Sequence, residues 1–283
     1  MSKELTLFTI AAVLACSVSS FASNNIDDGL NVTEEQQRLR EIQAKNDSVC
    51  VEGYNLFIAE RINWMATDSV LSRYSQEELG GNVIWQPTDS TWNAIFIDKE
   101  IKNCIFEMQY NKNDKRFKMS YDKRPITEVE LAKLSVKNVM LENLVKKCGN
   151  KITYDSDCGF PNMDFVRIDD NTVRLYILQG TVHNNLIPFG NDYSADFNND
   201  GELLCFRQYH KSLIATKTID DEGNPIVSAI HSHVKESPYI TPTDVCNFLL
   251  YRGQMQQFYV LSTALDVLIL YDAETNHTIV KSR

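Results

Sequence analysis

Residues 230–244 run Ile230-His231-Ser232-His233, then seven residues, then Thr241-Pro242-Thr243-Asp244. Side chains alternate between the two faces of a β-strand, so two histidines one residue apart point their imidazoles to the same side. A threonine followed by proline is typical of a helix start, which places Asp244 in the first helical turn. A strand end that faces a helix start can bring two imidazoles and a carboxylate to one point. The pattern therefore predicts a three-ligand metal site.

The flanking residues predict an α/β arrangement around this stretch. Pro225 to Ile230 is a nearly continuous apolar run, which indicates a strand buried on both faces. Apolar residues recur at helical spacing from Pro242 to Met255. Two further strands are expected at Phe258–Ser262 and Val267–Asp272.

We expect the domain that carries the metal site to span residues 124–283. Pro125 and Thr127 precede a long helical pattern that ends at Cys148-Gly149, and strands are expected at Asp164–Ile168 and Thr172–Leu178.

The stretch Asp196-Phe197-Asn198-Asn199-Asp200-Gly201 has two interpretations. Oxygen-bearing side chains at alternate positions before a glycine resemble the first half of a calcium loop. The twelfth position of such a loop should be glutamate, but it is Arg207. We therefore favour a hairpin turn, in which Asn-Asp-Gly supplies the positive φ angles and Glu202 to Thr216 forms the return strand.

The sequence pattern over residues 23–123 predicts a smaller α+β region, and it does not indicate a role for that region. Thr33 to Gln36 has the form of a capping box, and an amphipathic helix is expected around Tyr54 to Met65, with Gly80-Gly81 ending the helical part. Trp85 and Trp92 are interpreted as sheet packing. The expected strands are Asn82–Gln86, Thr91–Ile97, Cys104–Tyr110 and Arg116–Tyr121.

Composition and charge exclude one class of partner. The net charge is −10 and the isoelectric point is near 5.0, and there is no basic stripe of the kind that neutralises nucleic-acid phosphates. We therefore expect no nucleic-acid partner.

The N-terminus predicts export. Lys3 precedes an apolar run from Leu5 to Cys16, and the small residues Ser20 and Ala22 suit a signal-peptidase site, so we assign residues 1–22 to a signal peptide. The protein is then periplasmic or extracellular. Two alternatives remain, a retained membrane anchor and a lipoprotein box at 13–16 that would attach a lipid to Cys16. No later run approaches about 20 apolar residues, so the mature chain should have no transmembrane span.

If Cys16 leaves with the signal peptide, six of the seven cysteines remain. An even number in an exported chain is compatible with disulfides, and Cys148 and Cys158 bracket a segment of suitable length. Their pairing does not follow from the sequence.

The motif around His231 resembles that of the JAMM (MPN or JAB) metallopeptidases, in which an upstream glutamate precedes His-x-His, seven residues and Ser-x-x-Asp. The spacing matches completely, with Thr241 in place of serine. The resemblance implies a JAMM-like α/β domain, a Zn²⁺ ion held by His231, His233 and Asp244, and a peptide or protein substrate whose peptide or isopeptide bond is hydrolysed. Thr241 would then help to stabilise the oxyanion.

The family's glutamate has no obvious counterpart, because the strand expected at 172–180 contains no acid. Asp170 just before it, with its neighbour Asp169, and Glu202 on a later strand are candidates for the catalytic carboxylate. The alternative function is a catalytically inactive JAMM-like binding or structural module of the bacterial envelope. His183, His210 and His277 receive no role, and the oligomeric state is left open.

Overall fold

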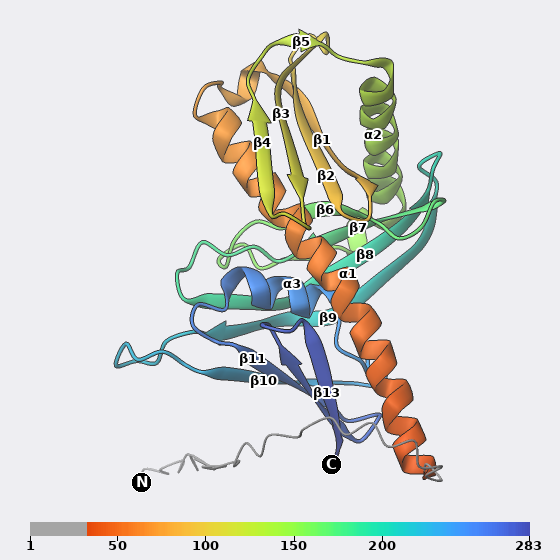
Figure 1. The fold of residues 1–283 in the computed structure, drawn as a ribbon, viewed down its shortest axis with the longest axis vertical. Helices are drawn as coiled ribbons and strands as arrows, with labels where there is room; N and C mark the ends of the chain where they lie inside the picture. The colour runs from red at the N-terminus through yellow and green to blue at the C-terminus, as the bar shows by residue number, and fades with distance from the viewer. Residues whose placement is uncertain (1–32) are drawn as a thin grey trace.

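The protein is described by a computed structural model over residues 33–283, so the predicted signal peptide and Cys16 lie outside the described residues. Within this range the chain is an α/β protein with three β-sheets and a few helices (Figure 1). None of the described helices combines the length and the apolar character that a membrane crossing requires.

The first sheet contains five strands and follows helix α1 (Glu34–Leu71). Its main path runs in the order β1-β2-β3-β4, and β5 pairs with β3. The strands are β1 (Leu79–Thr88), β2 (Thr91–Asp98), β3 (Asn103–Asn111), β4 (Arg116–Ser120) and β5 (Arg124–Pro125), which confirms the four predicted strands of this region.

The second and third sheets have four strands each, in the orders β6-β7-β8-β9 and β10-β11-β12-β13. Helix α2 (Glu128–Cys148) precedes the second sheet, and α3 (Pro242–Tyr251) connects β10 to β11. The strands are β6 (Asn162–Arg167), β7 (Thr172–Leu178), β8 (Leu186–Asn198), β9 (Leu203–Lys217), β10 (Ser228–His233), β11 (Gln257–Ser262), β12 (Val267–Asp272) and β13 (His277–Ser282). β10 and β11 pair in parallel, and the other pairs are antiparallel.

Helix α1 is a single helix of 38 residues, about 57 Å long at the α-helical rise, where the sequence suggested two segments. The predicted capping box is present, because Thr33 and Gln36 exchange hydrogen bonds. The helix ends at Leu71, so the expectation that Gly80-Gly81 terminates the helical part is wrong, and both glycines lie in β1.

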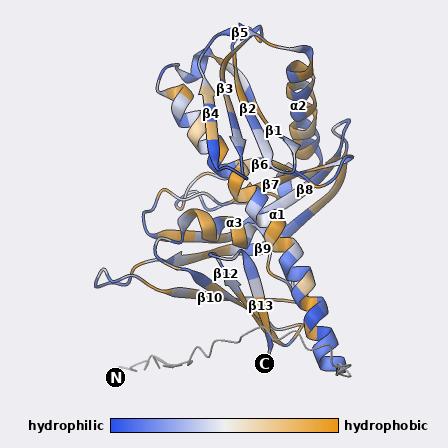
Figure 2. Cartoon of the chain, viewed as in Figure 1, coloured by the Kyte–Doolittle hydropathy of each residue, from blue (hydrophilic) through white to orange (hydrophobic). Residues whose placement is uncertain are grey.

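Different parts of α1 belong to different cores. Ile42 and Cys50 pack with the sheet of β10–β13 and with α3, whereas Ile58 and Ile62 pack with the first sheet. The helix therefore runs from the sheet of β10–β13 to the first sheet, as Figure 1 shows, and colouring by hydropathy shows apolar and polar residues interspersed along it (Figure 2).

The hairpin interpretation of residues 196–201 is confirmed. β8 and β9 pair in antiparallel fashion, Gly201 has φ of 82°, and the Asn198 side chain accepts hydrogen bonds from the backbone N–H groups of Asp200 and Glu202. Asp196 forms ion pairs with Arg174 and Arg207, and these pairs occupy both of its oxygens.

Strand β10 differs from its prediction. The apolar run at 225–230 indicated burial on both faces, but the strand begins at Ser228 and alternates between exposed and buried residues. Ala229 is buried, whereas 65% of the Ile230 surface is exposed. One face of this strand is uncovered by the described residues.

The cysteines of the described chain are free thiols, so Cys148 and Cys158, whose spacing is compatible with a disulfide, are not linked. Five of the six are buried and Cys205 is partly exposed.

Candidate metal centre

Strand β10 and helix α3 bring the three predicted ligands together. His231 and His233 point from β10 toward Asp244 in the first turn of α3, as predicted. The Nε2 atoms of the two histidines lie 3.1 Å apart, and each lies 3.3 Å from an oxygen of the Asp244 carboxylate. All three side chains are buried. Two strand residues and one helix residue thus present their ligand atoms to a common point.

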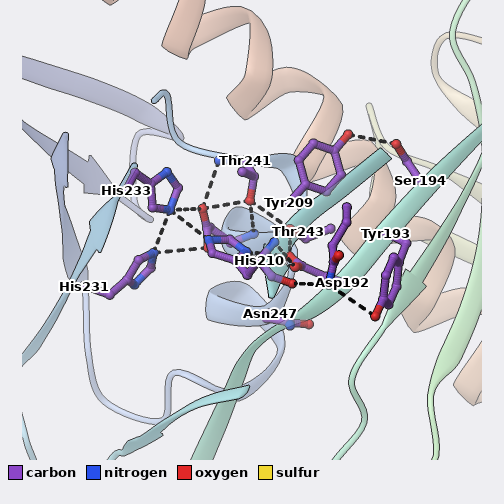
Figure 3. Close-up of polar contacts among 12 residues, drawn as sticks. Asp192, Tyr193, Ser194, Tyr209, His210, His231, His233, Thr241, Thr243 and Asn247 are labelled. Carbon is purple, nitrogen blue, oxygen red and sulfur yellow. Dashed lines mark hydrogen bonds and ion pairs between the residues drawn. The ribbon is translucent and has the colours of Figure 1, made fainter. Parts of the chain in front are cut away.

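A fourth ligand atom comes from His210 on β9, to which the sequence analysis assigned no role. Its Nε2 atom lies 2.9 Å from the Nε2 atom of His233 and 3.7 Å from Oδ1 of Asp244 (Figure 3). The ligand atoms of His210, His231, His233 and Asp244 all lie within 4.8 Å of one another. These buried residues could hold a metal ion.

The spacing of these atoms is close to that of ligands around one small ion. Zinc binds nitrogen and carboxylate oxygen at about 2.0–2.1 Å, so neighbouring ligands of a tetrahedral site lie roughly 3.3 Å apart. Five spacings, counting both oxygens of Asp244, range from 2.9 to 3.7 Å, and the four ligand atoms all lie within 4.8 Å of one another.

The histidines are oriented by partners on their other ring nitrogens. Nδ1 of His210 lies 2.9 and 3.0 Å from the two oxygens of Asp192 on β8, and Nδ1 of His233 lies 2.6 Å from the backbone carbonyl of Tyr239. Metal-bound histidines usually donate this second N–H to a carboxylate or a carbonyl, which fixes the tautomer that offers Nε2 to the ion. Both contacts are of that kind.

Asp192 is itself held in place. It accepts hydrogen bonds from the backbone N–H of His210, at 2.9 Å, and from the hydroxyl of Thr243. The carboxylate is 1% exposed, so its orientation is set by these contacts and not by water.

The capping box of α3 orients the Asp244 carboxylate. Its Oδ2 atom accepts hydrogen bonds from the backbone N–H and from the hydroxyl of Thr241, at 2.9 and 2.7 Å. Its Oδ1 atom is buried and has no hydrogen-bond partner among the described residues. An unsatisfied buried carboxylate oxygen is costly, and a cation at the centre of the cluster would satisfy it.

The electrostatics of the cluster also favour a cation. Burial opposes the protonation of His210, but the charges of Asp192 and Asp244 outweigh it and raise the pKa of His210 to about 9. Burial acts against the Asp244 carboxylate as well, yet the imidazoles of His210, His231 and His233 hold its pKa well below the ordinary value.

Aromatic rings form one wall of the centre. The His231 ring stacks on Phe258, with an interplanar angle of 18° and centroids 5.9 Å apart, and lies 4.9 Å from the Phe189 ring. Such packing limits the rotation of the imidazole and excludes water from that side.

A cleft of about 570 Å³ lies close to the centre, but none of the four cluster residues lines it. Its wall includes Thr241 and Tyr239, and the β9 segment Arg207–Tyr209 that leads into His210. Lys45 and Glu52 of α1 also line it.

The two acids considered for catalysis lie elsewhere. The side chain of Asp170 is 91% exposed and forms an ion pair with Arg167, and Glu202 is exposed at the β8–β9 turn, where it accepts from Asn198. His210 lies eight positions after Glu202, which is about 26 Å at the rise of a strand. The acidic side chain that does reach the cluster, beside Asp244, is Asp192.

The contribution of His210 was hidden by irregular pairing. Phe197 pairs with Leu203 beside the turn, and a regular register from there would place Gln208 opposite Asp192. Register shifts at Asp196/Phe197 and Asp192/Tyr193 place His210 there instead. The signal in the sequence was an acid and a histidine on the two arms of one hairpin.

Comparison of the chain with family models, with curated proteins and with solved structures finds no match. The class of protein is therefore described from its fold and its candidate site alone. This is an α/β protein with a buried His-His-Asp cluster within metal-binding distance, to which a third histidine is added.

Proposed function

We propose that His231, His233 and Asp244 bind a zinc ion, that Nε2 of His210 lies beside the fourth position, and that the protein is an exported zinc-dependent hydrolase of the JAMM type. The observation that carries the proposal is the convergence of these three buried side chains and His210, whose ligand atoms all lie within 4.8 Å of one another, on a His-x-His, seven-residue, Thr-x-x-Asp motif. The substrate would be a peptide or isopeptide bond in a protein outside the cytoplasm.

When bound, zinc supplies a water that is nucleophilic at neutral pH and a Lewis acid for the scissile carbonyl. The chain's own residues prepare the site. Asp192 acts through His210 as a positioning residue, Thr241 holds the Asp244 carboxylate in orientation, and the cleft beside Thr241 has room for a substrate segment.

Zinc content tests the metal site. We expect about one zinc per chain in the purified protein, and we expect His231→Ala to lose it. His277→Ala is the matched control, because the His277 side chain is 70% exposed and lies on β13, and it should keep full occupancy. Absence of zinc from the native protein after purification without chelator and reconstitution would remove the proposal.

A second candidate, an inactive module with a closed metal centre, is favoured by one observation. His210 occupies a fourth ligand position, and structural zinc sites have four protein ligands, whereas catalytic sites keep one position open. In that case zinc stabilises the domain and no bond is cleaved.

His210→Ala separates the two functions. A hydrolase in which three ligands suffice should keep zinc in this variant, while a closed structural centre should lose most of it. Digestion of a broad peptide library by the native protein, with and without chelator, provides the second measurement. A chelator-sensitive product supports the hydrolase, and a complete lack of cleavage by zinc-loaded protein supports the module.

A further inference from the structure

The sheet of β10–β13 has one covered and one uncovered face among residues 33–283. Val260, Ile269 and Tyr271 on the covered face pack with α1, α3 and β8. On the opposite face the register aligns side chains in rows that cross all four strands. The central row is Ile230, Tyr259, Leu270 and Ile279, and the row beside it is Ser232, Leu261, Leu268 and Lys281.

Six of these side chains are apolar, and they form one continuous patch that we call the outer face: Ile230, Tyr259, Leu261, Leu268, Leu270 and Ile279. Ile230 is 65% exposed and Ile279 is 50% exposed, and the other four are partly exposed. Single exposed apolar residues are ordinary, but a contiguous patch that crosses a whole sheet marks an interaction surface.

The edge of this sheet at β13 is closed to further strands. Gln43 of α1 donates to the carbonyl of Thr278 and accepts from the N–H of Val280, and Asp47 accepts from the N–H of Thr278. Side chains of the long helix thus occupy the hydrogen-bonding groups that a new strand would use. Strand addition at the β13 edge is therefore blocked.

We propose that the outer face packs against the same face of a second copy of the chain. A two-fold axis parallel to the strands, between β11 and β12, would place β10 over β13 of the second copy and β11 over its β12. Aligned sheet packing of this kind brings inner faces to about 10 Å.

In this arrangement the side chains that face each other across the interface are compatible in each row. Ile230 would face Ile279, Tyr259 would face Leu270, and Leu261 would face Leu268, so apolar residues meet apolar residues. In the flanking positions Lys281 would face Ser232 and Asp272 would face Gln257, so no like charges meet. An interface between identical patches must be self-complementary in this way.

Exposure at this edge of the sheet points in the same direction. Val227, just before β10, is 77% exposed and Ile230 within it is 65% exposed, so these apolar side chains lack cover among the described residues. A second copy would supply the missing cover. The proposal does not depend on the metal centre, whose ligands lie on the covered side.

Sedimentation and light scattering of the full chain, from about 1 to 100 µM, test the proposal. Four short strands make a small interface, so we expect a dimer with a dissociation constant on the order of micromolar. Leu270→Glu and Ile279→Lys should each shift the protein to monomer. Leu204→Lys is the matched control, because Leu204 is 58% exposed on β9, away from the outer face, and this variant should dimerise normally.

A cross-link tests the geometry. Ile230 and Ile279 lie on the two edge strands of one sheet, three strand spacings apart or about 14 Å, too far for a disulfide within one chain. Sheets about 10 Å apart also hold facing Cα atoms beyond the roughly 7 Å reach of a disulfide, so the test uses a thiol-reactive cross-linker of about 8 Å. The double variant Ile230→Cys/Ile279→Cys should be joined into a covalent dimer by this reagent, while each single variant should not.

Three outcomes would overturn the proposal. One is a protein that stays monomeric at 100 µM. Dimerisation after removal of residues 1–32 would then show that these residues cover the face, and binding of the monomer to vesicles would show that lipid does. Another is a dimer that persists in folded Leu270→Glu and Ile279→Lys proteins. The third is a double-cysteine variant that stays uncross-linked although it dimerises.

Discussion

Gly53 sets how closely helix α1 approaches helix α3, which carries Asp244. A Cβ atom at this position would lie 2.6 Å from Cβ of Val245 and 2.9 Å from the carbonyl oxygen of Pro242. Both atoms belong to the first turn of α3, which also carries Asp244. The substitution Gly53→Ala should therefore force this turn away from α1 and carry a metal ligand with it.

The expected effect on stability is the difference of two terms. Alanine is favoured over glycine by about 1 kcal/mol inside a helix. Overpacking of a tight core contact costs about 1–3 kcal/mol, and here one of the obstructing atoms is backbone, which cannot rotate away. We expect a net loss of up to about 2 kcal/mol, or a melting temperature lower by up to about 8 °C.

Zinc affinity should respond more sharply than stability, because ligand geometry tolerates displacements of only about 0.5 Å. A ten- to hundredfold loss, the usual cost of disturbing the support of a ligand, is expected for Gly53→Ala. Thermal unfolding with and without chelator, together with competition titration of zinc, measures both quantities.

Gly149→Ala is the matched control. At Gly149, the C-cap of α2, an added Cβ would meet only Cγ1 of Val145 at 3.7 Å, an ordinary contact, so stability and zinc affinity should change little. If Gly53→Ala proves as stable as Gly149→Ala and binds zinc as tightly, the crossing of α1 and α3 does not constrain the site, and the reasoning is refuted.

Three further outcomes are expected. Removal of zinc from protein that held it at a thousand times its dissociation constant should lower the free energy of unfolding by about 4 kcal/mol, measured by denaturant titration with and without chelator. Asp192→Asn should weaken zinc binding about 10- to 100-fold while leaving the fold intact by circular dichroism, and unchanged affinity would contradict its positioning of His210. Glu60 and Asp164 are buried side by side, and burial raises the pKa of both, so the folded state holds protons that the unfolded state releases. The contribution of this pair to stability should therefore be greatest below about pH 4 and should fall as the pH rises above that value. At pH 8 the Glu60→Gln variant should be more stable than the native protein by about 1–3 kcal/mol. Equal stability of the two proteins at pH 8 would show that the pair carries no such cost.

Local signals in the sequence identified most of the elements around the site. Capping residues marked the starts of the helices, since Thr33, Thr127 and Thr241 each accept a hydrogen bond from the third helical residue. The period-two geometry of a strand was sufficient to place His231 and His233 on one side. These features depend on neighbours in sequence, and they were predictable for that reason.

The remaining features depend on long-range packing. His210 reaches the centre only because register shifts displace the β8–β9 pairing, and a bulge leaves no simple mark in the sequence. The sequence predicts burial of both faces of β10, but one face is exposed. An apolar run indicates that a surface is covered, and does not indicate what covers it. The resemblance to the JAMM family predicts a catalytic carboxylate near the expected first strand of the domain. The acid that reaches the cluster beside Asp244 is instead Asp192 on β8.

The long helix at the start of the described chain has a consequence for the order in which the protein folds. Gln43 and Asp47 bond to β13, more than 230 residues later, and α3 packs on Gly53. During synthesis the helix emerges first, but two of its partners are completed last, and contacts so distant in sequence form slowly. Until the last strands are made, Ile42 and Cys50 of this helix lack the residues of β11 and β12 on which they pack. Loss of even the last few residues should leave that helix, and with it the approach to Asp244, without support.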